Sequence, residues 1–311
     1  MWKCSKDITL NSLSSNEIQD ELINLGLSIE KKIQCKEVFF SLELSSNMKF
    51  EGIHERFSSN AETCFPLFYA LPSHHGVLKC NSCDSLKLIA SLPNNTLLHL
   101  VANNLKKNNV KKLLDEALLC GKMNILALRG DAPFNDGDFA YTIDLVKFIK
   151  AEFGSKICIC VAGYPQMHPD SISKESDLFY LKEKVKAGAS FVITQFFFES
   201  SVFVDFVKDC THVGITVPII PGIFPFSSFK SLMKMSTMCS VNIPNKMLED
   251  LHPIKEDNAK IRNYGINLAV KLIREIYDTG VTHGFHLYTL NRSEMALEIF
   301  KRVGWCQPSS Q

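Results

Sequence analysis

The stretch Asn124-Ile125-Leu126-Ala127-Leu128-Arg129-Gly130-Asp131 decides the fold of this chain. A continuous apolar run that ends abruptly in charged residues is typical of a buried parallel strand whose last residues emerge at the rim of a sheet. Gly130 allows another backbone to approach closely there. Ligands of α/β proteins bind at the carboxyl ends of parallel strands, so Asp131 is a candidate functional residue. The competing interpretation is a solvated Arg-Asp pair in an ordinary loop, because tripeptides recur by chance.

Strand and helix patterns alternate on both sides of this stretch. Short apolar runs indicate buried strands, and most of them are separated by segments with apolar residues at helical spacing. We predict strands at 38–44, 66–71, 97–101, 125–128, 157–162, 191–194, 217–220 and 284–287. We predict helices at 110–120, 141–153, 177–187, 202–210, 258–277 and 294–303, with a polar insertion after the seventh strand.

Eight strands with intervening helices, in a chain of 311 residues, predict a single (β/α)8 barrel of the α/β class. An open doubly wound sheet is the alternative, but it should carry the glycine-rich motif G-x-G-x-x-G, which this sequence lacks. We divide the chain into an N-terminal extension at 1–36, the barrel at 37–305 and a tail at 306–311. Ser14 and Glu17 have capping-box spacing, which predicts a short helix in the extension.

Composition and charge indicate a globular protein that acts on small molecules. Hydrophobic residues make up 46% of the chain and the formal net charge is +1. This balance excludes a global field that would recruit nucleic acid or an anionic membrane. We expect a cytoplasmic protein, since no apolar run is long enough for a bilayer and residues 1–12 do not resemble a signal peptide. We expect the eleven cysteines to be free thiols, and no metal site at the lone Cys80-x-x-Cys83.

Unusual polar residues stand at the ends of most predicted strands. They are Glu43, His99, Asp131, Tyr164, His168, Gln195, Tyr288 and Arg292. Each residue alone would more often be a structural residue with satisfied hydrogen bonds. Six strands that each deliver a polar group to one rim instead indicate a binding or catalytic site.

Seven segments form an ordered set across residues 37–305. They are Phe40-Ser41-Leu42-Glu43, Ala127-Leu128-Arg129-Gly130-Asp131, Ala162-Gly163-Tyr164-Pro165 with His168-Pro169, Ile193-Thr194-Gln195-Phe196-Phe197-Phe198, Pro221-Gly222-Ile223-Phe224-Pro225, Ile261-Arg262-Asn263-Tyr264-Gly265 and Leu287-Tyr288-Thr289-Leu290-Asn291-Arg292. The set resembles the methylenetetrahydrofolate reductase family. The resemblance implies an FAD-containing barrel that reduces 5,10-methylenetetrahydrofolate to 5-methyltetrahydrofolate with NAD(P)H, in one-carbon and methionine metabolism. The partners implied are a reduced folate and a nicotinamide nucleotide, which use one pocket in turn.

The resemblance implies two catalytic carboxylates. Methylene-folate accepts hydride poorly until one of its nitrogens is protonated, so the reaction needs a general acid, and Glu43 matches that position. Phe39, Phe40 and Leu42 precede Glu43 and are expected to raise its pKa toward neutrality. Asp131 would lie between the flavin and the pterin, where its charge favours the cationic iminium that follows ring opening.

The same resemblance implies a set of substrate-binding residues: Asp131, Gln195, Phe229, Tyr288 and Arg292. The Gln195 amide can both donate to and accept from a pterin edge. Arg292 suits the glutamate carboxylate of folate, Tyr288 is a neighbouring wall, and the Phe229 ring could stack on either substrate.

The residues implied to bind FAD belong to the third, fourth and fifth predicted strands and the segments that follow them. They are His99, Arg129, Gly130, Asp131, Tyr141, Thr142, Ala162, Tyr164, His168, Asp177 and Lys184. Lys184 and His168 can meet the diphosphate, Asp177 can accept from a ribose hydroxyl and Tyr164 can pack on the ring system. For Lys184 the competing interpretation is a solvated helix face shared with Lys182 and Lys186.

The chain departs from the family pattern at three places. Leu44-Ser45-Ser46-Asn47 follows Glu43 where aromatic and proline residues are usual, and Pro72 and Val101 each stand where a threonine is common. A non-catalytic flavin- or folate-binding relative is therefore the alternative function, although the retained Glu43 and Asp131 favour the enzyme. We expect no C-terminal S-adenosylmethionine-binding domain. The donor, NADPH or NADH, and the formation of homo-oligomers stay open.

Overall fold

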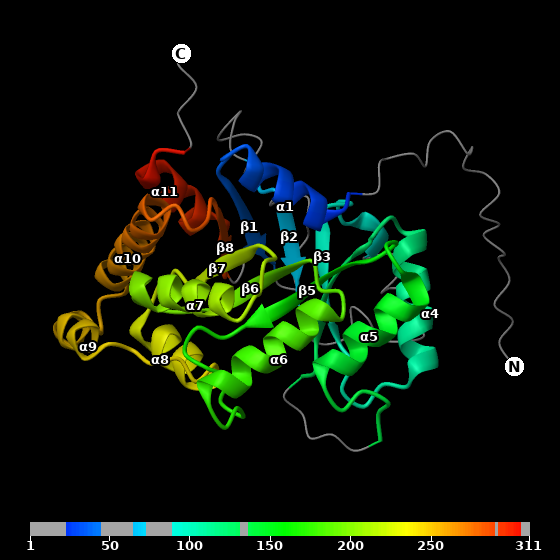
Figure 1. The fold of residues 1–311 in the computed structure, drawn as a ribbon. Helices are drawn as coiled ribbons and strands as arrows, with labels where there is room; N and C mark the ends of the chain where they lie inside the picture. The colour runs from blue at the N-terminus through cyan, green and yellow to red at the C-terminus, as the bar shows by residue number, and fades with distance from the viewer. Residues whose placement is uncertain (1–22, 45–64, 73–88, 131–135, 290–291, 306–311) are drawn as a thin grey trace, which may run out of the picture.

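The computed structural model describes residues 23–44, 65–72, 89–130, 136–289 and 292–305. Within these ranges eight parallel strands close into a barrel in chain order, so β1 pairs with both β2 and β8 (Figure 1). The strands are β1 (Phe39–Glu43), β2 (Phe68–Leu71), β3 (Thr96–Val101), β4 (Asn124–Leu128), β5 (Cys158–Gly163), β6 (Phe191–Phe196), β7 (Ile219–Ile223) and β8 (Gly284–Leu287). The predicted closed barrel is confirmed. Ser14, Glu17, Cys80 and Cys83 lie outside the described ranges.

Helices surround this barrel, and most of them overlap their predicted ranges (Figure 1). They are α4 (Lys107–Leu119), α5 (Thr142–Phe153), α6 (Lys174–Lys186), α7 (Ser200–His212), α10 (Asn258–Asp278) and α11 (Ser293–Val303). Among the helices in the described ranges, none combines the length and the apolar character needed to cross a bilayer.

The predicted polar insertion after the seventh strand is wrong, because that segment is helical. It forms α8 (Phe229–Met238), α9 (Asn245–Leu251) and the short 3-10 helix η2 (His252–Ile254). These helices cover a cluster of aromatic side chains from β6 and the end of β7, namely Phe196, Phe198, Phe224 and Phe226. The helix α9 escaped prediction because it has only seven residues, whereas α8 was missed although its apolar residues stand at helical spacing.

Alternation along each strand divides the core into two layers. Phe39 of β1 belongs to the cluster that fills the barrel, together with Phe68, Ala70, Leu97, Leu126, Cys158, Cys160, Phe191, Ile193 and Ile220. Phe40 and Leu42 belong instead to the larger cluster between the strands and the helices. Ser41 and Glu43 therefore share the inner face of β1 with Phe39. The cysteines in the described ranges are free thiols, as expected.

Helix α1 (Leu25–Gln34) closes the end of the barrel at which the strands begin. Leu25 and Ile29 are fully buried and join the cluster that fills the barrel. The sequence places this helix in an extension outside the barrel, whereas the structure makes it part of the barrel core.

Asn124 at the start of β4 anchors α1. Its Oδ1 accepts from the Leu25 N–H at 2.9 Å, and its Nδ2 donates to the Ile23 carbonyl at 2.8 Å. The Gly26 N–H lies 3.2 Å from the Cys158 Sγ of β5. These bonds satisfy main-chain groups at the beginning of a helix, which have no partner within the helix itself.

We expect Asn124→Ala to lower the free energy of unfolding by about 2 to 4 kcal/mol, because it leaves the buried main-chain groups of residues 23 and 25 without partners. Urea denaturation measures the change. Leu27→Ala on the exposed side of α1, where Leu27 is 66% exposed, is the matched control and should change stability by less than about 0.5 kcal/mol. Equal effects of both substitutions would contradict the anchoring role of Asn124.

Candidate functional site

Three of the predicted residues meet at the carboxyl ends of β1, β6 and β8. Glu43 is the last residue of β1, Gln195 lies in β6 and Tyr288 directly follows β8. All three are partly buried. The Glu43 carboxylate is close enough to raise the pKa of Tyr288, so the mouth of the barrel holds an acid beside a phenol.

The Glu43 carboxyl is removed from water. Burial raises its pKa from 4.5 to about 8, which is the expected direction, although Phe40 and Leu42 pack on the opposite face of β1 and do not surround the carboxyl. None of the side chains in the described part of the chain forms an ion pair or hydrogen bond with this carboxyl. Glu43 is therefore protonated at neutral pH and can donate a proton to a bound ligand.

Tyr288 is held by the strands beside it. Its hydroxyl donates to the Thr194 carbonyl at 2.8 Å. A Cβ on Gly222 would lie only 2.5 Å from the Tyr288 ring, so only glycine allows the ring to pack on β7. The Gly222 N–H in turn donates to Thr194 Oγ1 at 3.0 Å. Burial, followed by the charge of Glu43, raises the Tyr288 pKa well above its usual value, so the phenol stays neutral.

Gln195 stands at an irregularity in the pairing of β6 with β7, between Ile193 and Phe196. Its Oε1 accepts from the Phe196 N–H at 2.9 Å. We expected both the donor and the acceptor of this amide to be available to a ligand. In the structure the oxygen is already engaged by the main chain, so the side chain presents chiefly its NH2 group.

The predicted flavin residues on β5 and α6 form a second group beside the mouth. Lys184 Nζ points back from α6 toward the Ala162 carbonyl, 3.5 Å away. Burial lowers the Lys184 pKa. Lys184 therefore does not belong to a solvated helix face, whereas Lys186 is exposed and pairs with Glu183. Within the described ranges no carboxylate lies at ion-pair distance from Lys184.

The loop between β5 and α6 is tied by short polar contacts. Arg129 Nη2 pairs with Asp170 Oδ2 at 2.8 Å. Asp177 accepts from the His168 N–H at 3.3 Å and from Ser171 Oγ at 3.0 Å. His168 Nδ1 accepts from the Asp170 N–H at 3.1 Å, and burial lowers the His168 pKa. The neutral ring therefore carries its proton on Nε2, which is left to donate.

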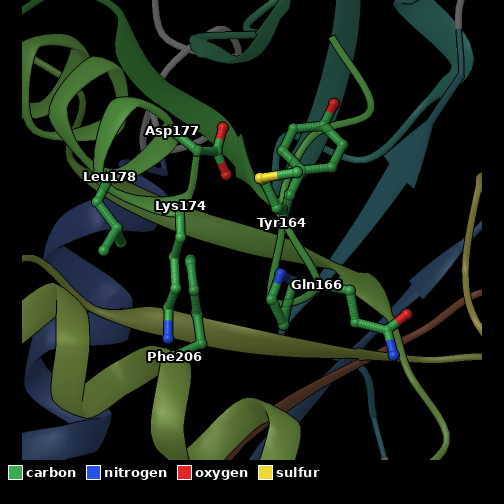
Figure 2. Close-up of a pocket in the computed structure, with 8 residues that line it drawn as sticks. Tyr164, Gln166, Lys174, Asp177, Leu178 and Phe206 are labelled. Atoms are coloured by element: carbon green, nitrogen blue, oxygen red, sulfur yellow. The ribbon is translucent and has the colours of Figure 1, made fainter. Parts of the chain in front are cut away.

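A cavity of about 230 Å³ lies beneath this loop, between α6 and α7. It is lined by Tyr164, Pro165, Gln166, Met167, Lys174, Asp177, Leu178 and Phe206. Figure 2 shows the Asp177 carboxylate directed toward the side of the cavity where Tyr164 lies, and Gln166 directed away. Glu43 and Tyr288 do not line this cavity, which therefore flanks the mouth of the barrel.

Gly130 and Val101 lie against each other at the ends of β4 and β3. Gly130 has a φ of +97°, and a Cβ there would lie 2.5 Å from Val101 Cγ1. Any other residue would be both strained and in collision. Asp131 lies outside the described residues.

The remaining predicted residues are more scattered. His99 is buried in β3 within the barrel, near enough to His286 to affect its titration. Tyr141 is 63% exposed just before α5, and Thr142 is the first residue of that helix. Phe229 begins α8 and packs on the aromatic cluster under it.

Arg292 immediately precedes α11. Its Nη1 is buried and has no hydrogen-bond partner within the part of the chain that the structure describes. A buried guanidinium nitrogen without an acceptor is costly, so a carboxylate ligand would stabilise it.

Sequence reasoning missed three polar residues at the junction of β1 and β8. Ser41 Oγ lies 2.8 Å from His286 Nδ1, and Thr289 Oγ1 donates to the Glu43 carbonyl at 2.7 Å. Ser41 and His286 each stand two positions before a predicted site residue. The period of two along a strand would have placed them on the same inner face.

Comparison with known proteins agrees with this arrangement. The family model for methylenetetrahydrofolate reductase matches residues 28–304. A probable methylenetetrahydrofolate reductase (NADPH) of Caenorhabditis elegans is 35% identical over 289 residues, which cover 89% of this chain and 44% of that protein. Methylenetetrahydrofolate reductase (NADH) 1 of Zea mays is 38% identical over 230 residues, covering 69% of this chain and 39% of that protein.

A solved structure shares the fold at low sequence identity. An uncharacterized protein from Clostridium thermocellum, which binds two copies of 5-methyl-5,6,7,8-tetrahydrofolic acid, superposes with a TM-score of 0.60 at 12% identity. The match covers 89% of this chain and 99% of that one. The chain spans less than half the length of its nematode and maize relatives, 44% and 39% respectively. On the family match and these identities, the chain belongs to the methylenetetrahydrofolate reductase family.

Proposed function

We propose that this barrel catalyses the FAD-dependent reduction of 5,10-methylenetetrahydrofolate to 5-methyltetrahydrofolate with NAD(P)H. The observation that carries the proposal is the protonated Glu43 carboxyl, which stands without a partner among the described side chains at the mouth of the barrel. A non-catalytic relative would have no need to keep a carboxyl in a setting that costs folding stability. The reductase names of the relatives support the same reaction.

Glu43 is the general acid of the proposed reaction. Protonation of a ring nitrogen of methylene-folate opens the five-membered ring to an iminium, which accepts hydride. A carboxyl with a pKa of about 8 is protonated at cellular pH yet loses its proton readily to an amine. Asp131 is the second carboxylate of the proposed site, and its negative charge favours the cationic iminium.

Four further residues would orient the substrate in the proposed reaction. The Gln195 NH2 can donate to the pterin, and the neutral Tyr288 ring forms a wall beside it. Arg292, with its unsatisfied Nη1, suits the glutamate carboxylate of folate. Phe229 at the start of α8 offers a ring on which either substrate can stack.

The residues around β5 and α6 fit FAD. A buried ammonium at Lys184 lacks a described carboxylate within ion-pair distance, and a diphosphate would supply the missing negative charge. His168 can donate from Nε2 to the same group, and Tyr164 and Asp177 line the adjoining cavity. His99, Arg129, Gly130, Asp131, Tyr141, Thr142 and Ala162 complete the proposed binding set. FAD would carry electrons from the nicotinamide to the folate, which no side chain can do.

We propose that the protein acts in the cytoplasm on these small molecules alone. Its balanced charge supports the absence of nucleic-acid or membrane partners. The names of the relatives include both NADPH and NADH, so the choice of donor is left to experiment.

An anaerobic visible spectrum tests the proposed function. The purified protein, loaded with FAD, is mixed with NADPH or NADH and then with methylenetetrahydrofolate. We expect the flavin absorption to bleach with one nicotinamide and to return with the folate, which reports both half-reactions and identifies the donor. A protein that takes up no FAD, or whose bleached flavin is not reoxidised by the folate, would refute the proposal.

Lys184→Met should weaken FAD binding about 10- to 100-fold, because it removes a charge-assisted contact to the diphosphate. Titration of the apoprotein with FAD, followed by flavin fluorescence, measures the dissociation constant. Lys186→Met on the same helix is the matched control, since its ammonium is exposed and pairs with Glu183. Equal affinities for the two variants would remove Lys184 from the proposed cofactor site.

Glu43→Gln should leave flavin reduction by nicotinamide intact and slow flavin reoxidation by the folate at least about 100-fold, because an amide is not a general acid. In the wild type the folate half-reaction should fall as the pH rises through about 8, since the acid form of Glu43 is then lost. Stopped-flow absorbance measures both steps. A variant whose folate step keeps the wild-type rate would exclude Glu43 as the acid.

A further inference from the structure

We propose that Thr289 is a positioning residue for Glu43, and that it works with the Ser41–His286 pair beneath it on the same strands. This inference rests on the function proposed above. It concerns how the chain fixes the Glu43 side chain, to which no side chain in the described ranges bonds.

Thr289 links the first and the last strand of the barrel at Glu43. Its Oγ1 donates to the Glu43 carbonyl at 2.7 Å, and Thr289 is only 2% exposed. The bond joins the last residue of β1 to the segment after β8, at the level where both strands stop pairing. On the other side of β1, the Leu44 N–H donates to the Ala70 carbonyl of β2 at 2.8 Å. The main chain at Glu43 is therefore held from both neighbouring strands.

Ser41 and His286 form a second tie across the same two strands. They are direct neighbours in the pairing of β1 with β8, both are buried, and Ser41 Oγ lies 2.8 Å from His286 Nδ1. The His286 ring stacks parallel to Phe68 at 6.2 Å and stands perpendicular to the Tyr288 ring at 4.8 Å. Burial, followed by the charge of His99, lowers the His286 pKa to about 3, so this ring is neutral.

Such ties matter because the Glu43 carboxyl has no side-chain partner of its own among the described residues. Its direction follows from the main chain that carries it. A general acid must reach its acceptor at hydrogen-bond distance, and a displacement of about 1 Å can cost about 100-fold in rate. Besides Glu43, the described titratable groups that act on this region are His99 from β3, Cys160 from β5, Tyr164 after β5, Cys239 after α8, and His286 and Tyr288 from the β8 end. His286 and Tyr288, the two of these groups that belong to the β8 end, are both neutral at neutral pH.

The first test separates the two half-reactions in three variants of the FAD-loaded protein. Thr289→Val keeps the shape of the side chain and removes its hydroxyl, so the folate step should slow about 10- to 100-fold while reduction by nicotinamide serves as the internal reference. Thr289→Ser restores the hydroxyl and should recover the folate step. Thr279→Val is the matched control, because Thr279 Oγ1 makes the same kind of bond, to the Ile276 carbonyl at 2.6 Å, after α10.

The second test needs no activity. A carboxyl whose pKa is raised on folding contributes stability that is present below its unfolded-state pKa and lost as the pH rises through its folded-state pKa. Glu43 should therefore make the wild type lose stability between pH 4.5 and about 8. If Thr289→Val frees the carboxyl to turn toward water, this loss becomes shallower in urea unfolding. His286, whose pKa falls from 6.5 to about 3, acts in the opposite direction below pH 6.5 and is present in every variant, so it cancels in difference curves.

The outcomes distinguish this inference from the proposed function. If the wild type fails to reduce the folate, the proposed function is refuted. The role of Thr289 is then tested only by the pH dependence of the difference in unfolding stability between Thr289→Val and the wild type. Equal slowing of both half-reactions in Thr289→Val, or an unchanged folate step with an unchanged difference curve, would overturn the inference. If Thr289→Val does not fold, Ser41→Ala takes its place, and it should slow the folate step in the same direction and leave flavin reduction as the reference.

Discussion

Closure of the eight strands determines which side chains are removed from water. In a closed parallel barrel alternate residues point inward, and the interior has room for few of them. On β1 this places Phe39, Ser41 and Glu43 in one column, the first deep in the apolar filling and the last at the mouth. The acid is thus desolvated by the same geometry that builds the core. The buried position of Glu43 therefore has two consequences: it lowers the stability of the fold at high pH, and it keeps the carboxyl protonated for use as an acid.

The same closure fixes the neighbours of the acid. Tyr288 can lie across β7 only because Gly222 has no side chain, and Gly130 leaves room for Val101 in a similar way at the ends of β3 and β4. Such glycines hold two strand ends at van der Waals distance without adding any group of their own. The mouth is consequently built from close main-chain approaches on β3, β4 and β7 as much as from the polar side chains that line it.

The strands and most of the helices could be predicted because their signals are local: apolar runs of four to six residues, and helical spacing between them. The polar residues at strand ends were predictable for the same reason, since Glu43 and Tyr288 each come at the end of an apolar run and parallel strands end at the same edge of the sheet. The helix α9 was missed because seven residues carry little periodic signal, whereas α8 was missed although its apolar residues stand at helical spacing. The contacts Ser41–His286 and Thr289–Glu43 join residues 245 and 246 positions apart, and a single sequence holds no local trace of such pairs. The main-chain bond that occupies the Gln195 oxygen was equally hidden, because it depends on an irregular register with β7.

The junction of β1 and β8 also joins the first and the last strand of the fold. Strand β1 can pair with β8 only after the whole chain between the two strands has been placed. Closing so long a loop costs more entropy than the pairing of strands that follow one another in the chain. Glu43 acquires its neighbours from β8 only at that moment. We therefore expect the Glu43 carboxyl to be more exposed to water in a chain that has not yet closed, so the raised pKa of the acid becomes a sign that the barrel is complete.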